Sequence, residues 1–159
     1  MHLRALIAEK LAGIATPEEL PFFVSLLPGR GTVPDDKIRE YAILGLGRLG
    51  SDDAVKALQS HRASPNPDIR RSVALALGNT RSPAAVPILI EMYSDEAARN
   101  DACLSLATLR HDPWCDGADT TAETQSMWRD WWRTHGSRST LFGRDQCLPL
   151  DRLVPLVKE

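Results

Sequence analysis

The sequence predicts an all-α fold, an α-α solenoid of about four helix pairs, and three observations lead to this prediction. Residues 38–58 and 69–89 align at an offset of 31 with nine identities in 21 positions. Apolar residues within the repeated phrase recur every three or four positions, which is typical of amphipathic helices. Capping residues, prolines and acids recur at regular intervals and indicate helix starts. A unit repeated about every 30 residues indicates stacked helix pairs that share one core.

The first unit is predicted to contain helices 2–14 and 17–27. Thr16 and Glu19 form the ends of a capping box, with proline between them at the first helical position. Charged residues interrupt the apolar residues of 1–15, so this stretch predicts an amphipathic helix rather than a signal peptide or a membrane span. We therefore expect no association with a membrane.

The next three units are predicted from the same start signals. Each start places a Ser, Asn, Thr or Pro before acidic residues or proline, which suits the positive end of a helix. The second unit is predicted at 35–49 and 52–61, the third at 67–79 and 83–93, and the fourth at 95–109 and 120–135.

The repeat pattern ends after Arg110, and the last predicted helix differs from the others. Trp128, Trp131 and Trp132 lie at i, i+3 and i+4, so they share one broad face. We interpret this face as a cap on the last repeat, because terminal units of solenoids must be atypical. A partner-docking surface is the alternative, since aromatic residues are common interface anchors.

Two regions follow from this organisation. Residues 1–135 are predicted to form the solenoid with its Trp-rich C-terminal capping helix. Residues 136–159 are predicted to be an irregular tail, because Pro149 and Pro155 exclude one continuous helix there.

Composition limits the classes of function. The chain has 159 residues, 43% hydrophobic content and a formal net charge of −2, which gives no general attraction to nucleic acid or anionic membranes. Cys103, Cys115 and Cys147 are an odd number at irregular spacings. This pattern favours reduced cysteines and a cytoplasmic location.

The repeated phrase Ile-Arg-x-x-x-x-Leu-x-Leu-Gly, followed by Ser-x-x-Ala-Val-x-x-Leu, resembles the HEAT-like repeat of phycobilisome lyases over residues 2–110. The resemblance implies a right-handed α-α superhelix whose Ile-Arg helices line the concave side. It also implies that each arginine of the phrase pairs with an acid near the preceding turn. The implied structural ladder joins Arg39, Arg70 and Arg99 to Asp35 or Asp36, Asp68 and Asp95.

The sequence carries no recognisable catalytic or metal-binding pattern. The four histidines sit in no nucleophile–base context that a hydrolase needs. His111, Cys115, Asp116 and Asp119 lack the paired spacing of a metal site. We therefore expect no enzyme, no cofactor and no metal.

A row of leucines is the strongest candidate for a binding surface. Leu75 lies about 200° around the helix from Val73 and Leu77, so we expect it to point away from the core. Leu44 and Leu104 occupy the same slot in the neighbouring repeats. The ladder along the concave groove is flanked by Tyr41, Arg48, Arg71, Asn79, Asn100 and Thr108.

Such a groove suits a protein or peptide partner, in particular an amphipathic helix or peptide. Alternatively, neighbouring helices or the Leu/Pro-rich tail cover the leucines. The sequence does not determine the oligomeric state.

Two further functions are alternatives. A nucleic-acid-binding HEAT domain, similar to bacterial HEAT-fold DNA glycosylases, would use Arg48, Arg71, Arg81 and Arg110, but the net charge and nearby acids disfavour it. A bilin lyase or isomerase subunit is implied only by the name of the repeat family.

Overall fold

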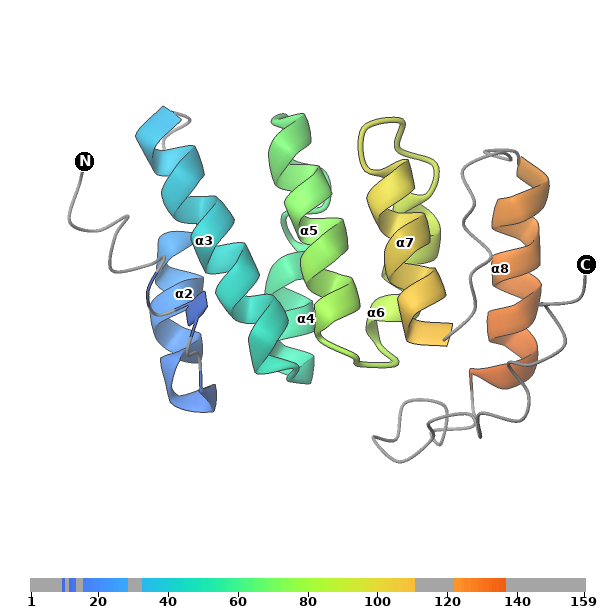
Figure 1. Cartoon of the computed structure of the whole chain (residues 1–159), viewed down its shortest axis with the longest axis horizontal. Coiled ribbons are helices and arrows are strands. Elements are labelled where there is room, and N and C mark those ends of the chain that lie inside the picture. The colour runs from blue at the N-terminus through green and yellow to red at the C-terminus, as the bar shows by residue number, and fades with distance from the viewer. Residues whose placement is uncertain (1–9, 11, 14–15, 29–32, 111–121, 137–159) are drawn as a thin grey trace, which may run out of the picture.

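The structure is a computed structural model that describes residues 10, 12–13, 16–28, 33–110 and 122–136. All regular elements in this part of the chain are helical, and no strand occurs among its residues. A short 3₁₀ turn, η1, precedes the first helix (Figure 1). The elements are η1 (Pro17–Glu19), α2 (Leu20–Leu26), α3 (Val33–Leu49), α4 (Asp52–Gln59), α5 (Pro67–Asn79), α6 (Ala85–Met92), α7 (Arg99–Arg110) and α8 (Ala122–His135).

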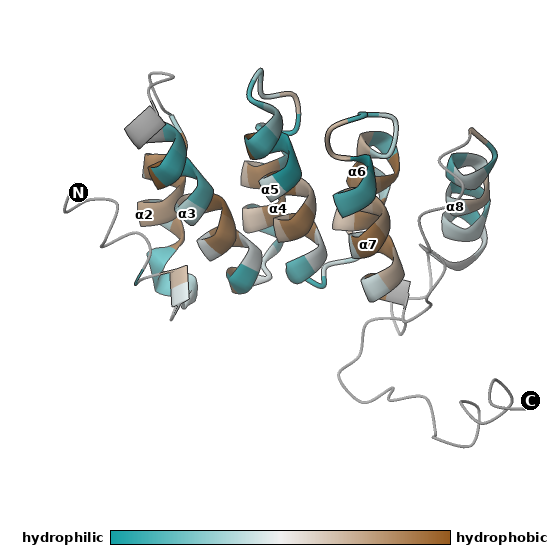
Figure 2. Cartoon of the chain, turned by 45° about the horizontal axis from the view of Figure 1, so that its top comes forward, coloured by the Kyte–Doolittle hydropathy of each residue, from teal (hydrophilic) through white to brown (hydrophobic). Residues whose placement is uncertain are grey.

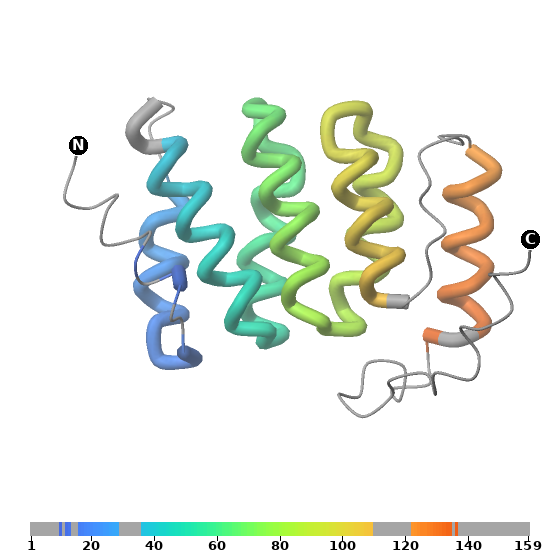
Figure 3. The backbone as a smooth tube through the Cα atoms, viewed as in Figure 1, coloured from blue at the N-terminus to red at the C-terminus, as the bar shows by residue number. Residues whose placement is uncertain are grey.

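The helices form an α-α solenoid. Helices α3, α5 and α7 pack side by side in one layer, here called the inner layer (Figures 1 and 3). Helix α2 packs on α3, α4 packs on α3 and α5, and α6 packs on α5 and α7. Helix α8 packs on α6. Units therefore contact their neighbours along the stack, and the predicted all-α solenoid is confirmed.

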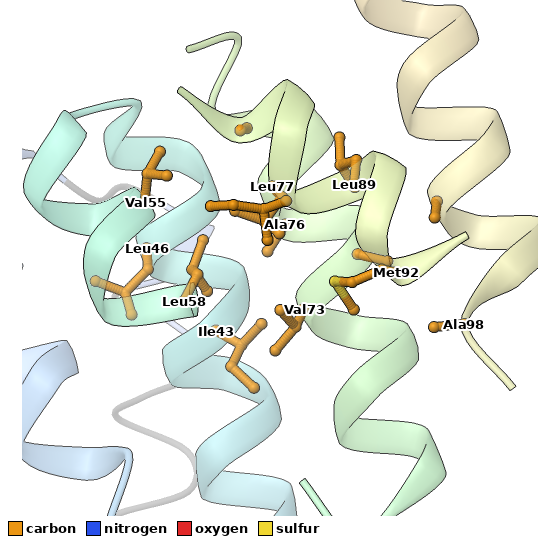
Figure 4. Close-up of a cluster of buried hydrophobic side chains, with 14 of the residues drawn as sticks. Ile43, Leu46, Val55, Leu58, Val73, Ala76, Leu77, Leu89, Met92 and Ala98 are labelled. Atoms are coloured by element: carbon orange, nitrogen blue, oxygen red, sulfur yellow. The ribbon is translucent and has the colours of Figure 1, made fainter. Parts of the chain in front are cut away.

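The repeated apolar positions build the core between the layers. Leu46, Leu77 and Leu106 occupy one slot in three successive units, and each is at most 1% exposed. Side chains from α4 and α6, such as Leu58 and Leu89, meet them from the other layer (Figure 4). Burying a leucine in this way stabilises the fold by about 1.5–3 kcal/mol.

The glycine of the repeated phrase allows the inner helices to approach closely. A Cβ on Gly47 would lie 2.9 Å from both Cα and O of Ala76. A Cβ on Gly78 would lie 2.5 Å from Oγ of Ser105, whose hydroxyl donates to the carbonyl of Ala74 at 3.0 Å. In the next unit the slot holds Ala107, and no further inner helix follows α7 among the described residues.

Several predicted helix starts are confirmed by their hydrogen bonds. The backbone N–H of Thr16 donates to Oε2 of Glu19 at 2.6 Å, which closes the Glu side of the capping box. Ser51 and Asn66 accept the N–H groups of Ala54 and Asp68 at 3.1 and 2.9 Å, and so satisfy backbone donors that the first helical turn leaves free. Ser82 accepts the N–H of Ala84 at 3.2 Å in the turn before α6, whose N-cap is Ala84 and carries no side-chain cap.

The largest error in a predicted helix start concerns the last inner-layer helix. The helix expected from residue 95 begins at Arg99, and a turn occupies the residues before it. Oδ1 of Asp95 accepts the N–H of Ala97 at 2.9 Å, so the aspartate closes a local turn instead of capping the helix. The helix expected at 83–93 is also shorter, spanning Ala85–Met92. The prediction for 2–14 falls mostly outside the described residues, and that for 136–159 does so beyond Gly136.

Helix α8 meets the rest of the structure through its aromatic face. Trp128 is 2% exposed, and the partly buried Trp131 and Trp132 pack against the same core. Nε2 of Gln125 donates to the carbonyl of Ile90 and to Oγ of Ser94, both at 2.7 Å. The tryptophans therefore pack inward, as a capping helix requires, and the capping role itself stays a prediction.

The C-terminal end of α5 is followed by a residue, Arg81, whose backbone conformation is unfavourable for a side chain with a Cβ. Gly50, which follows α3, has φ of 64°, and Arg81 in the equivalent position after α5 has φ of 52°. Glycine adopts this left-handed conformation at no steric cost, whereas a residue with a Cβ is strained there.

We predict that Gly47→Ala destabilises the fold by about 1–2 kcal/mol, because overpacking against the Ala76 backbone outweighs the gain in helix propensity of about 1 kcal/mol. Urea unfolding measures the change. The matched control is Gly13→Ala, since a Cβ there meets nothing within 4 Å. Equal effects of the two substitutions would contradict the close approach of α3 and α5.

We predict that Arg81→Gly raises the free energy of unfolding by about 0.5–1 kcal/mol, because it relieves the strain of the left-handed conformation. Gly50→Ala should lower it by a similar amount. Thermal melts of both variants check this, and a loss of stability in Arg81→Gly would refute the assignment.

Candidate functional site

The nine residues predicted to bind a partner all lie on the three inner-layer helices. None belongs to the buried core cluster. Figure 2 shows hydrophobic residues along the middle of these helices and hydrophilic residues at their N-terminal ends. The nine predicted site residues are Tyr41, Leu44 and Arg48 on α3, Arg71, Leu75 and Asn79 on α5, and Asn100, Leu104 and Thr108 on α7.

Leu44, Leu75 and Leu104, here called the leucine row, take equivalent positions on adjacent helices. Leu44 is 39% and Leu104 is 56% exposed, so both point away from the core, as the repeat alignment indicates for this slot. Leu75 is only partly exposed. Leu75 lies outside the buried core cluster, as expected, and its partial burial agrees with the place of α5 between α3 and α7 in the layer.

Ion pairs occupy the N-terminal side of the leucine row. Nε of Arg71 donates to Oδ2 of Asp101 at 3.0 Å and links α5 to α7. This hydrogen bond, followed by the charge of Asp101, raises the pKa of Arg71. Lys37 pairs with Glu40 at 2.6 Å on α3. The cations on this side are therefore paired with acids of the same surface.

Hydrogen bonds to backbone carbonyls engage two residues on the other side of the row. Nη1 of Arg48 donates to the carbonyl of Gly13 at 2.8 Å. The hydroxyl of Thr108 donates to the carbonyl of Leu104, also at 2.8 Å. Asn79, which is exposed, lies on α5, the helix between those of Arg48 and Thr108. The row is thus apolar with polar side chains on both sides.

The arginines of the repeated phrase are structural. Nε of Arg39 donates to the carbonyl of Leu27 at 2.9 Å, Nη1 of Arg70 donates to that of Ser64 at 2.8 Å, and Nε of Arg99 donates to that of Tyr93 at 3.2 Å. The carbonyls of Leu27 and Tyr93 directly follow α2 and α6, and that of Ser64 lies in the turn segment between α4 and α5. Arg39 and Arg99 therefore satisfy acceptors that helix C-termini leave free, and Arg70 satisfies one in a turn.

The expected acid partners are correct only in part. Arg39 pairs with Asp36 at 3.0 Å, as the resemblance implies. Arg70 pairs instead with Asp95 of the next unit, at 2.5 Å, and the expected partner Asp68 is exposed and lies 4.0 Å from Arg71. Asp95 therefore forms its ion pair with Arg70, and the expectation that Asp95 pairs with Arg99 is wrong. Sequence spacing favoured local acids and missed this contact between units.

The remaining chemical expectations concern metals, membranes and cysteines. Within the described residues, no three His, Cys, Asp or Glu side chains are close enough to hold a metal ion, and residues 111–119 lie outside them. No helix in that part of the chain combines the length and apolar composition that a membrane crossing needs. Cys103 is disulfide-bonded, so the expectation of reduced cysteines is wrong for it. The cysteines therefore no longer favour a cytoplasmic location, which stays a prediction.

We predict that Asp95→Asn destabilises the fold by about 1–2 kcal/mol at neutral pH, because it removes a charge-assisted bond to Arg70. Burial raises the pKa of Asp95, but the hydrogen bonds from Arg70 and from the backbone N–H of Ala97 together lower it by more. The net pKa of Asp95 therefore lies below the ordinary value of 3.8. The ion pair therefore contributes stability above this pH and loses it as the pH falls through the native pKa.

Urea unfolding between pH 7 and pH 3 tests this sign. The gap in stability between the native sequence and Asp95→Asn should narrow in the most acidic samples. Asp68→Asn is the exposed control and should change stability by less than about 0.5 kcal/mol. A gap that stays constant with pH would rule out the Arg70–Asp95 contribution.

Comparison with known proteins agrees with this architecture. Residues 30–107 match the family model described as HEAT repeats. No curated protein matches the chain. The matched residues contain α3 to α6 and most of α7, so this stretch, which carries the leucine row, is similar to HEAT repeats.

Proposed function

We propose that the chain is a non-enzymatic scaffold that binds a protein or peptide partner through the inner-layer face centred on the leucine row. The observation that carries this proposal is the exposure of Leu44 and Leu104, 39% and 56%, in register on helices of one layer. Large apolar side chains that repeat in register on an exposed face are typical of interaction surfaces.

The surroundings of the row also favour recognition of a protein segment. Interfaces place apolar side chains at the centre and polar groups at the rim. Here the rim contains the exposed residues Arg48, Asn79 and Thr108 on one side and the Arg71–Asp101 ion pair on the other. HEAT repeats generally serve as protein-interaction scaffolds, which supports the same proposal.

The composition of the face disfavours nucleic acid. Binding to a phosphate backbone needs arginines and lysines that are free to neutralise phosphates. Arg71 and Lys37 are paired with Asp101 and Glu40 on the face itself. The bilin-binding alternative, which the likeness to phycobilisome-lyase repeats raised, has no residue on this face to support it.

We predict that peptides selected from a displayed library on the intact chain lose at least 10-fold in affinity for the Leu104→Glu variant. A carboxylate in an apolar contact costs more than about 1.4 kcal/mol, which corresponds to this factor. The thermal melt of the variant should stay close to that of the native sequence, because Leu104 is 56% exposed. Fluorescence anisotropy measures the affinities.

The control is Val24→Glu, because Val24 is 40% exposed on α2, outside the inner layer. This variant should bind the selected peptides as the native chain does. Peptides that bind both variants equally would disprove the assignment of the face. Binding of duplex DNA that weakens steeply between low and moderate salt would support the nucleic-acid function instead.

A further inference from the structure

The leucine row sets a spacing that any occupant must match. Gly47 against Ala76, and Gly78 against Ser105, bring the inner helices into direct contact. Helices packed in this way lie about 8–10 Å apart. A segment that crosses the layer over Leu44, Leu75 and Leu104 therefore needs an apolar side chain about every 8–10 Å.

The chain itself contains a segment with this spacing. Residues 148–157 read LPLDRLVPLV, with leucines at 150, 153 and 156, every third position. Pro149 and Pro155 fix their own φ near the value of a polyproline II helix. That helix has three residues per turn and rises about 3.1 Å per residue, so the three leucines would share one edge about 9 Å apart.

Other conformations do not reproduce the match. In an α-helix, leucines three residues apart would be separated by only about 4.5 Å along the axis, and Pro155 would interrupt the helix. In a β-strand, successive leucines of this pattern would point to opposite faces. Only the polyproline II geometry places all three leucines in line with the row.

The segment is also within reach of the row. It lies in residues 137–159, outside the described part of the chain, and Leu150 follows Gly136 by 14 residues (150 − 136). Such a connection spans up to about 46 Å when extended, whereas the row spans about 20 Å. Helix α8 packs on α6, which in turn packs on α7. The connection therefore starts on the side of the stack where the row ends in Leu104, away from Leu44.

We propose that residues 148–157 of this chain occupy the leucine row of the same molecule as a polyproline II segment. Leu150, Leu153 and Leu156 then contact Leu104, Leu75 and Leu44 in that order. Because this inference rests on the proposed function of the face, the segment acts as a built-in competitor that a partner must displace.

Site-specific photo-crosslinking of the full chain tests this directly. Leu104 is replaced by p-benzoylphenylalanine, the protein is irradiated, and mass spectrometry locates the crosslinks. We expect crosslinks to residues 148–157 within monomeric product, and their loss when Leu153→Glu is added. Val154→Glu, one residue away, should retain them, and a crosslinker at Val24 on α2 should give none to this segment.

Three results would overturn the proposal. They are crosslinks from position 104 only to other regions, crosslinks to residues 148–157 found only in dimeric product, and crosslinks that survive Leu153→Glu unchanged. The second result would assign the segment to another copy of the chain.

The peptide selection separates this inference from the proposed function. If the segment competes with partners, peptides selected on the native chain should bind Leu153→Glu at least several-fold more tightly. If peptides are selected but the expected crosslinks are absent, the binding of residues 148–157 to the leucine row is contradicted, and the partner-binding function is not. Crosslinks without any selectable peptide, even on Leu153→Glu, would contradict the partner-binding function and leave the segment as a permanent cover.

Discussion

The close approach of the three inner helices is the constraint on which the rest of the structure depends. It exists because Gly47 and Gly78 present no Cβ to the helix that follows, so Ala76 and Ser105 pack directly against backbone. The hydroxyl of Ser105 adds a hydrogen bond to α5. Since each inner helix is held in the same register, equivalent residues fall into rows across the layer. The leucine row is one such product of the packing.

Polar contacts tie the layers and the units together without forming a catalytic arrangement. Arginines of the inner helices donate to carbonyls of the segments that follow the other-layer helices, and Arg70 reaches Asp95 of the next unit. Asn66 donates to Asp36, and Ser82 donates to Asp52, again between neighbouring units. These bonds satisfy groups that helix ends and turns would leave free. Stability in such a stack is distributed over nearest-neighbour interfaces.

The sequence predicted the architecture well because the repeat, the helix period and the caps are all local patterns. It failed where one side chain had a choice of partners. Asp95 looks like a helix cap, but it closes a turn and binds Arg70 of the previous unit, which moves the start of α7 to Arg99. The partial burial of Leu75 depends on the helices α3 and α7 that flank α5. The disulfide at Cys103 depends on distances in space between cysteines, which their spacing in the sequence does not encode.

The candidate face was predictable in position but not in its electrostatics. Aligning the repeats placed Leu44 and Leu104 in one slot, and their exposure follows from helix geometry. The ion pair of Arg71 with Asp101 joins residues 30 positions apart on different helices, so only the packing shows it. That pairing decides the character of the face, since it neutralises a cation that a phosphate backbone would need.

The most direct test of the account is the distance between positions 44 and 104, measured by electron paramagnetic resonance with spin labels on genetically encoded amino acids. Two helix spacings of about 8–10 Å predict a narrow distribution with backbone positions about 16–20 Å apart. A broad distribution, or one centred beyond about 30 Å, would contradict the close-packed inner layer and the leucine row that it presents.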